Sequence, residues 1–158
     1  MTTLDHEVDA LTEPWAPAGT ADDPLLHAQV QAGYAAQMHL LDDGDGAAWA
    51  ATFTDDGVFE ANAHPEPCRG RSAIAAAAQA VADDLAARGI TRRHWLGMLS
   101  VRRTGPRTAS ARSYAIVLMT PLGGQPRIQC STSCDDDLVL DGDRWLVRHR
   151  RVHRDDLP

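Results

Sequence analysis

The chain has 158 residues, 44% of them hydrophobic, and a formal net charge of −7. This length and composition suit a folded domain with its own core and exclude a disordered chain. The acidic balance argues against a protein that binds nucleic acid or an anionic membrane over its whole surface. Residues 1–13 lack the basic start and apolar run of a signal peptide, and no stretch approaches the ~20 apolar residues of a membrane span, so a cytoplasmic protein is expected.

The first part of the chain predicts a tail followed by a helix. Residues 1–22 combine prolines with scattered acids and are expected to form a flexible tail, ahead of a single domain over residues 23–154. Asp23 is a good N-cap, and Pro24 suits the first position of a helix. Apolar residues then recur at helical spacing over residues 26–41, and an Asp-Asp-Gly sequence ends the helix.

Two more helices and a short strand are expected next. Asp45 is a candidate N-cap for a short second helix. The sequence Asp55-Asp56-Gly57 is expected to turn the chain into a strand over residues 58–62. Ser72 can cap a third helix over residues 73–88, and the glycine that follows ends it.

The rest of the chain is typical of long strands, over residues 93–103, 108–120, 127–140 and 144–152. Because the turns between them are short, neighbouring strands must pair antiparallel. The expected fold class is therefore α+β: a curved antiparallel sheet wrapped with three helices into a cone. Such a cone has an apolar interior, which suits a small hydrophobic or aromatic ligand.

The order of these elements and several short motifs are similar to a known family. The motifs are Tyr34, Leu41 to Asp45, Phe53 to Phe59, Gly70-Arg71 with Ile74, Arg93-His94, Asp136, Leu138-Val139, Trp145 and Arg148 to Val152. On these residues, over about positions 25–152, the chain resembles the SnoaL-like polyketide cyclases of the nuclear transport factor 2-like superfamily. That superfamily also contains scytalone dehydratase, ketosteroid isomerase, limonene epoxide hydrolase and the small subunits of ring-hydroxylating dioxygenases. The resemblance implies a cystatin-like roll and chemistry without a cofactor.

Asp42 and His94 are the first candidates for catalysis. In the dehydratase branch of the superfamily, a carboxylate at the end of the first helix faces a histidine near the start of a sheet strand, and these two residues match those positions. A carboxylate that orients an imidazole leaves the second ring nitrogen free to move a proton. The alternative is that Asp42 only ends the helix and His94 is a core histidine.

Tyr34, Tyr114 and Asp136 are further candidates. Either tyrosine could donate a hydrogen bond to a developing enolate, although Tyr34 also fits the buried stripe of its helix and the face of Tyr114 depends on the strand register. One of the three acids at positions 135–137 must point inward if the strand is regular, and the resemblance favours Asp136. A solvated acidic rim is the alternative.

Large apolar side chains are expected to pack in the core or line the cavity. They are Met38, Trp49, Phe53, Phe59, Trp95 and Met98. Met98 stands where many family sequences carry asparagine, and the second histidine of the dehydratase pattern is absent from Ser113-Tyr114-Ala115. These departures favour an apolar pocket with few polar groups.

The leading hypothesis is a cyclase, dehydratase or isomerase that acts by acid–base chemistry on a polyketide-like aromatic intermediate of secondary metabolism. The alternative is a small-molecule-binding protein or accessory subunit without chemistry of its own. Epoxide hydrolysis is a weaker alternative, which would need Asp136 and Arg112 to face inward together.

We also expect a homodimer formed through the sheet, with the basic last strand and its Trp145 as a candidate part of the interface. Nucleic acid is not expected as a partner, because the charges of the basic run over residues 148–154 alternate between the two faces of a strand. No metal is expected, because the histidines are scattered in sequence, and no glycine-rich phosphate loop occurs.

Overall fold

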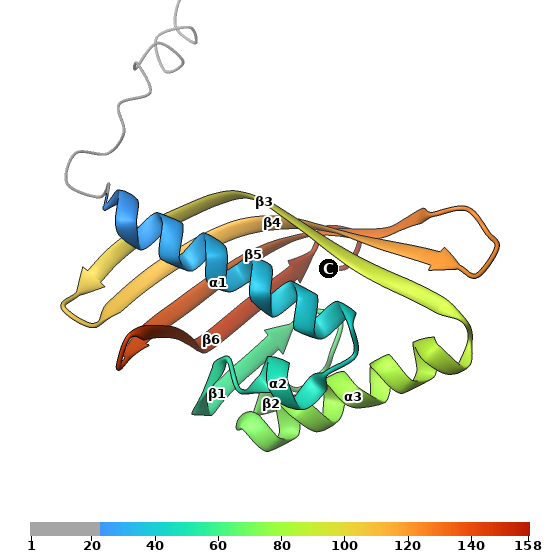
Figure 1. Ribbon diagram of the computed structural model, residues 1–158, viewed down its shortest axis with the longest axis horizontal. Coiled ribbons are helices and arrows are strands. Elements are labelled where there is room, and N and C mark those ends of the chain that lie inside the picture. Colours follow the sequence, from blue (N-terminus) through green and yellow to red (C-terminus); the bar gives the residue numbers. More distant parts are fainter. Residues whose placement is uncertain (1–22) are drawn as a thin grey trace, which may run out of the picture.

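The computed structural model describes residues 23–158, so the tail predicted for residues 1–22 lies outside the described residues. A strongly curved sheet forms one side of the molecule, and α1 lies against its concave face with α2 and α3 beside it (Figure 1). The helices are α1 (Pro24–Asp42), α2 (Gly46–Ala50) and α3 (Arg71–Ala87). The strands are β1 (Phe53–Ala61), β2 (Cys68–Arg69), β3 (Ile90–Gly105), β4 (Thr108–Pro121), β5 (Arg127–Asp141) and β6 (Arg144–Arg154).

The six strands follow the order β2-β1-β6-β5-β4-β3. The four long strands β3 to β6 pair antiparallel through short turns, as predicted. β1 instead pairs parallel to β6, with Val58 opposite His149. This pairing was not predicted, because it joins segments that are distant in sequence and no local turn announces it. The fold class is nevertheless the expected one, a curved and unclosed sheet with three helices.

The local signals of α1 act as predicted. The Asp23 side chain accepts a hydrogen bond from the backbone N–H of Leu26 over 3.0 Å, and proline occupies the first turn. The helix buries Leu26, Val30 and Tyr34. It ends at Asp42, and Gly44 then adopts a φ of 82°, which glycine reaches without strain.

Two predicted boundaries were wrong. β1 begins at Phe53, so Asp55-Asp56-Gly57 lies inside the strand, where the register to β6 shifts. Gly57 makes this path possible, because a Cβ there would stand 2.9 Å from the Phe53 Cβ. α3 begins at Arg71 after Gly70 and has no side-chain cap, so Ser72 does not cap it.

The core fills one end of the cone. Its fully buried members include Leu26 and Val30 of α1, Phe53 of β1, Leu138 of β5 and Val147 of β6. Leu26 and Val30, in the N-terminal half of α1, belong to the same cluster as the three strand residues. The C-terminal half of the same helix, with Met38 and Leu41, borders an open space instead.

Candidate active site

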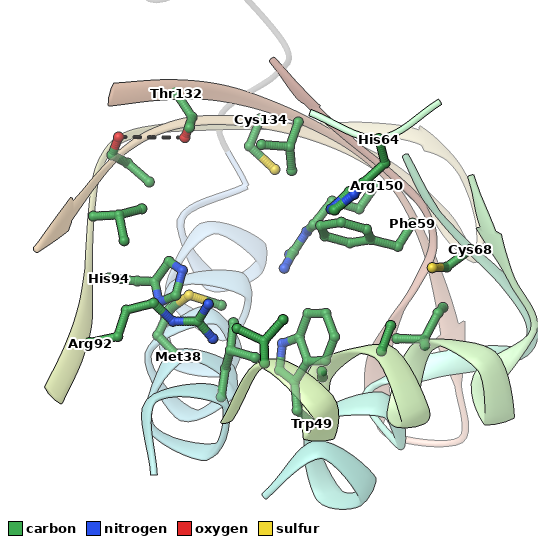
Figure 2. A pocket seen from close by; sticks show the side chains of 18 of the residues that line it. Met38, Trp49, Phe59, His64, Cys68, Arg92, His94, Thr132, Cys134 and Arg150 are labelled. Atoms are coloured by element: carbon green, nitrogen blue, oxygen red, sulfur yellow. Dashed lines mark hydrogen bonds between the residues drawn. The ribbon is translucent and has the colours of Figure 1, made fainter. Parts of the chain in front are cut away.

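A cavity of about 430 Å³ lies between the helices and the inner face of the sheet (Figure 2). Most of its wall is apolar, and the polar side chains are few. The apolar lining includes Met38, Leu41, Trp49, Phe59, Ile74, Val81, Leu96, Val117 and Val152. The polar and ionisable lining is His64, Glu66, Cys68, Arg92, His94, Ser113, Thr132, Cys134 and Arg150. A volume of this size is in the range of pockets that hold small organic ligands.

His94 lines this cavity and contacts Asp42, which is not part of the lining. The Nδ1 atom of His94 lies 2.6 Å from Oδ1 of Asp42, and the backbone N–H of His94 donates to Oδ2 over 2.9 Å. Both side chains are mostly buried, with 6% of Asp42 and 16% of His94 exposed. Asp42 is the last residue of α1, where the helix dipole disfavours a negative charge, and these two hydrogen bonds offset that effect.

The contact fixes the protonation pattern of the imidazole. An ionised carboxylate only accepts hydrogen bonds, so Nδ1 of His94 carries the proton that it donates to Asp42. Nε2 is then left as the basic nitrogen. Because His94 lines the cavity, this arrangement suits proton transfer to or from a bound molecule.

Asp136 is the centre of a second, fully buried network. Its carboxylate pairs with Arg150, whose Nη2 and Nε lie 2.6 Å and 3.0 Å from its oxygens, and it accepts a hydrogen bond from the Tyr34 hydroxyl. Arg150 Nη2 also donates to Gln37 over 3.0 Å. The Cys134 thiol donates to Asp136 over 3.4 Å.

This network keeps its members in fixed protonation states. Burial, together with the Asp136 charge, holds the pKa of the Tyr34 hydroxyl well above its usual range. Burial also raises the pKa of the Cys134 thiol to about 12. Burial alone would lower the pKa of Arg150, but the charge and hydrogen bond of Asp136, together with Cys134 and Tyr34, raise the pKa above its usual range. Arg150 and Cys134 of this network line the cavity, whereas Tyr34, Gln37 and Asp136 do not.

Three cavity residues carry a buried polar atom without a hydrogen-bond partner among residues 23–158. They are Arg92 at Nε, Trp49 at Nε1 and Ser113 at Oγ. Arg92 and His94 lie on the same face of β3, and Figure 2 shows both side chains on one side of the cavity. Burial lowers the pKa of Arg92, and the negative charge of Asp42 opposes that effect.

The structure corrects the predicted position of several residues. Tyr114, Trp95 and Met98 were expected near the cavity but lie on the outer face of the sheet, with 54%, 72% and 79% of each residue exposed. Strand alternation explains Trp95, because His94 faces inward. Met98 lies at an irregularity in the β3–β4 register and has a φ of 52°. Phe53 is a core residue with no exposed surface.

Three of the apolar predictions, Met38, Trp49 and Phe59, do line the cavity. Sequence reasoning missed Arg92 and Arg150 as cavity residues. The signal for Arg92 was available, since it stands two positions before His94 on a strand and therefore shares its face. The inward direction of Arg150 depends on the pairing that places it opposite Asp136, which the sequence alone does not provide.

Arg112, which was proposed together with Asp136 for epoxide hydrolysis, lies at the surface. Arg112 pairs with Asp135 over 3.4 Å on the outer side, so the Asp136–Arg112 arrangement expected for epoxide hydrolysis does not form. Trp145, expected at an interface, donates a hydrogen bond from Nε1 to Gln29 of α1.

Within residues 23–158, no group of three His, Cys, Asp or Glu side chains lies close enough together to hold a metal ion. In the same part of the chain, no helix has the length and apolar character to cross a membrane.

Comparisons with known proteins agree with this architecture. Aln2 from a Streptomyces species is 32% identical, with 86% of this chain and 95% of that chain covered and a TM-score of 0.79. ActVI-ORFA from Streptomyces coelicolor is also 32% identical, with 85% and 98% covered and a TM-score of 0.78. A structure from Catenulispora acidiphila in complex with S-DNPA is 33% identical, with 84% and 96% covered and a TM-score of 0.73.

None of the curated proteins matches the chain. The protein-family model of the SnoaL-like domain matches residues 25–151. This range includes both Asp42 and His94 and nearly all of the described sheet. The chain therefore belongs to the SnoaL-like domain family.

Proposed function

We propose that this protein is a cofactor-independent cyclase, dehydratase or isomerase that moves a proton on a polyketide-like aromatic molecule. The observation that carries the proposal is the 2.6 Å contact that Asp42 makes with His94, a residue that lines a largely apolar cavity. The likeness to the Catenulispora acidiphila protein, whose structure holds S-DNPA, supports a small-molecule ligand.

The reaction step follows from the geometry of the pair. Nε2 of His94 removes a proton from a carbon next to a carbonyl group, and Asp42 stabilises the imidazolium that forms through the Nδ1–H hydrogen bond. The same nitrogen returns the proton to another carbon, to a leaving hydroxyl, or to the alkoxide oxygen that forms when an enolate carbon adds to a second carbonyl. Ring closure by aldol addition, dehydration and double-bond migration all share this step.

Arg150 provides a fixed donor for a ligand oxygen. Its Nε and Nη2 are engaged by Asp136 and Gln37, so Nη1 holds the N–H groups that remain for a ligand in the cavity. The network behind it holds the guanidinium in place before the ligand arrives. A group that needs no rearrangement stabilises developing negative charge most effectively.

Tyr34 and Asp136 therefore take a supporting role in this proposal. The Tyr34 hydroxyl donates to Asp136, and the Asp136 carboxylate is fully engaged by Arg150 and its neighbours. Both act on the ligand only through the position of Arg150. Tyr114 is exposed on the outer face and takes no part.

The proposal is tested by deuterium uptake into a simple ketone. The bicyclic ketone α-tetralone is incubated with the protein in D₂O, and NMR follows exchange of the hydrogens next to its carbonyl. Replacement His94→Gln should slow the catalysed exchange by about 10²–10⁴-fold, the usual contribution of a positioned acid–base group. His149→Gln is the matched control, because His149 also contacts a carboxylate, Glu60 at 3.0 Å, but lies outside the cavity lining.

Each outcome of that experiment decides something. Catalysed exchange that survives His94→Gln unchanged contradicts the proposal. A wild-type protein that binds the ketone without accelerating exchange supports the alternative, a binding protein or accessory subunit. This alternative is supported by the absence of the second histidine of the dehydratase pattern from Ser113-Tyr114-Ala115, of which Ser113 and Ala115 line the cavity.

We further propose that the protein forms a homodimer through the outer face of the sheet. Trp95 pairs with Ile116 across β3 and β4, and Tyr114 lies opposite Gly97 on the same face. These three apolar residues are exposed together, and exposed apolar patches mark interfaces. Sedimentation equilibrium should show a dimer for the wild type and a monomer for Trp95→Asp. A wild type that stays monomeric at high protein concentration contradicts this part of the proposal.

A further inference from the structure

Arg92 is the charged member of the three cavity residues that carry an unpartnered buried polar atom in the described chain. Among residues 23–158 it makes no ion pair and no side-chain hydrogen bond, and its Nε is buried without a partner. Arginine carries five N–H donors in a planar fork and no acceptor. Arg92 is half-buried, and burying its Nε–H without a partner is unfavourable, so this donor calls for an external acceptor.

The nearby acids do not supply that acceptor. Asp42 acts on Arg92 through its charge, but both of its oxygens accept hydrogen bonds from His94. Asp136 is fully engaged by Arg150. Asp43, which lies beside the same strand, is 4.0 Å from Arg93 on the outer side.

We propose that Arg92 binds a carboxylate of the ligand, so that the natural substrate is an aromatic or polyketide-like acid. The inference rests on the proposed function, because it concerns the same cavity. A carboxylate offers two oxygens at the spacing of the guanidinium fork, and one negative charge matches the one cavity arginine without a direct partner in the described residues.

The position of Arg92 along β3 sets where this carboxylate lies. Arg92 and His94 are two residues apart on the strand, which separates them by roughly 6–7 Å along its axis. A ligand whose acid group contacts Arg92 can therefore place a carbon several bonds away against Nε2 of His94. An acid-bearing side arm or terminus on a ring system has this form.

The test compares two probes of nearly equal shape, 2-naphthoic acid and 2-naphthamide, by isothermal titration calorimetry at neutral pH. The wild type should bind the acid about ten- to a hundredfold more tightly than the amide, the usual advantage of a charge-assisted pair. Arg92→Gln should remove this preference. Arg93→Gln should keep it, because Arg93 is exposed on the opposite face of the same strand.

Arg92→Lys keeps the charge but not the fork, and it should retain only part of the preference. If thermal melting shows that Arg92→Gln does not fold, the Arg92→Lys variant tests the role of Arg92 in its place. A wild type that binds both probes equally, or does not hold the acid at all, overturns the inference, as does an Arg92→Gln protein that keeps the preference.

The inference and the proposed function fail in different ways. His94→Gln should lose catalysed exchange and still prefer the acid. A protein with His94-dependent exchange but no preference for the acid refutes the role of Arg92 alone.

Discussion

Replacement of Asp136 by asparagine should destabilise the protein strongly. The side chains of Asp136 and Arg150 are 1% and 5% exposed, and they are joined by contacts of 2.6, 3.0 and 3.2 Å. The asparagine side chain would keep the shape of the aspartate but leave the buried guanidinium without a counter-charge. Removing one partner of such a buried pair costs about 3–5 kcal/mol of unfolding free energy. For a domain of this size, that corresponds to a melting temperature about 10–20 °C lower.

The neighbouring residue provides the control for this measurement. Asp137 pairs with Arg151 over 2.8 Å, one position further along the same two strands but on the outer face, where 36% and 46% of the side chains are exposed. Asp137→Asn should cost no more than about 1 kcal/mol. Urea unfolding followed by circular dichroism measures both variants.

A double variant separates the charge effect from lost packing. Asp136→Leu with Arg150→Met removes both charges, so it should cost clearly less than the sum of the two single changes. The reasoning is refuted if Asp136→Asn is no more destabilising than Asp137→Asn. It is also refuted if the double variant costs the full sum.

Two further predictions concern other parts of the cavity wall and the helices beside it. The raised pKa of Cys134 means that the folded state holds the thiol proton more tightly than the unfolded state does. The free energy of unfolding should therefore fall as the pH rises from about 9 towards 12. Urea unfolding at a series of pH values from about 8 to 10 should show this decline, and Cys134→Ala should reduce it. Gly46→Ala should destabilise the protein by about 1–3 kcal/mol, because a Cβ there would stand 2.9 Å from the Ala75 carbonyl oxygen of α3. Gly33→Ala is the control and should not destabilise the protein, because a Cβ at that position meets nothing within 4 Å.

The parts of the fold that depend on local chemistry were predictable. Asp23 and Asp45 both cap helices with their side chains, and short turns join the four long strands. The start of β1 was misplaced, because Asp55-Asp56-Gly57 has the composition of a turn. In the structure it lies inside the strand, beside the irregular pairing with β6, a strand that is far away in the sequence.

The candidate site also has parts that could be predicted from the sequence and parts that could not. Asp42 and His94 were found from their order and context, but their contact joins residues 52 apart in sequence, and only the docking of α1 on β3 creates it. Which face a strand residue occupies depends on register. Tyr114 faces outward because its neighbours Ser113 and Ala115 line the cavity, and that assignment needs the pairing of β4 with β3.

The protonation pattern of His94 tests the central claim most directly. In protein labelled with ¹⁵N at the histidine rings, NMR distinguishes the protonated ring nitrogen from the unprotonated one. At a pH where the ring is neutral, we predict a protonated Nδ1, held by Asp42, and an unprotonated Nε2 whose resonance shifts when α-tetralone enters the cavity. A protonated Nε2, or a resonance that does not respond to the ketone, would contradict the assignment of His94 as the group that moves the proton.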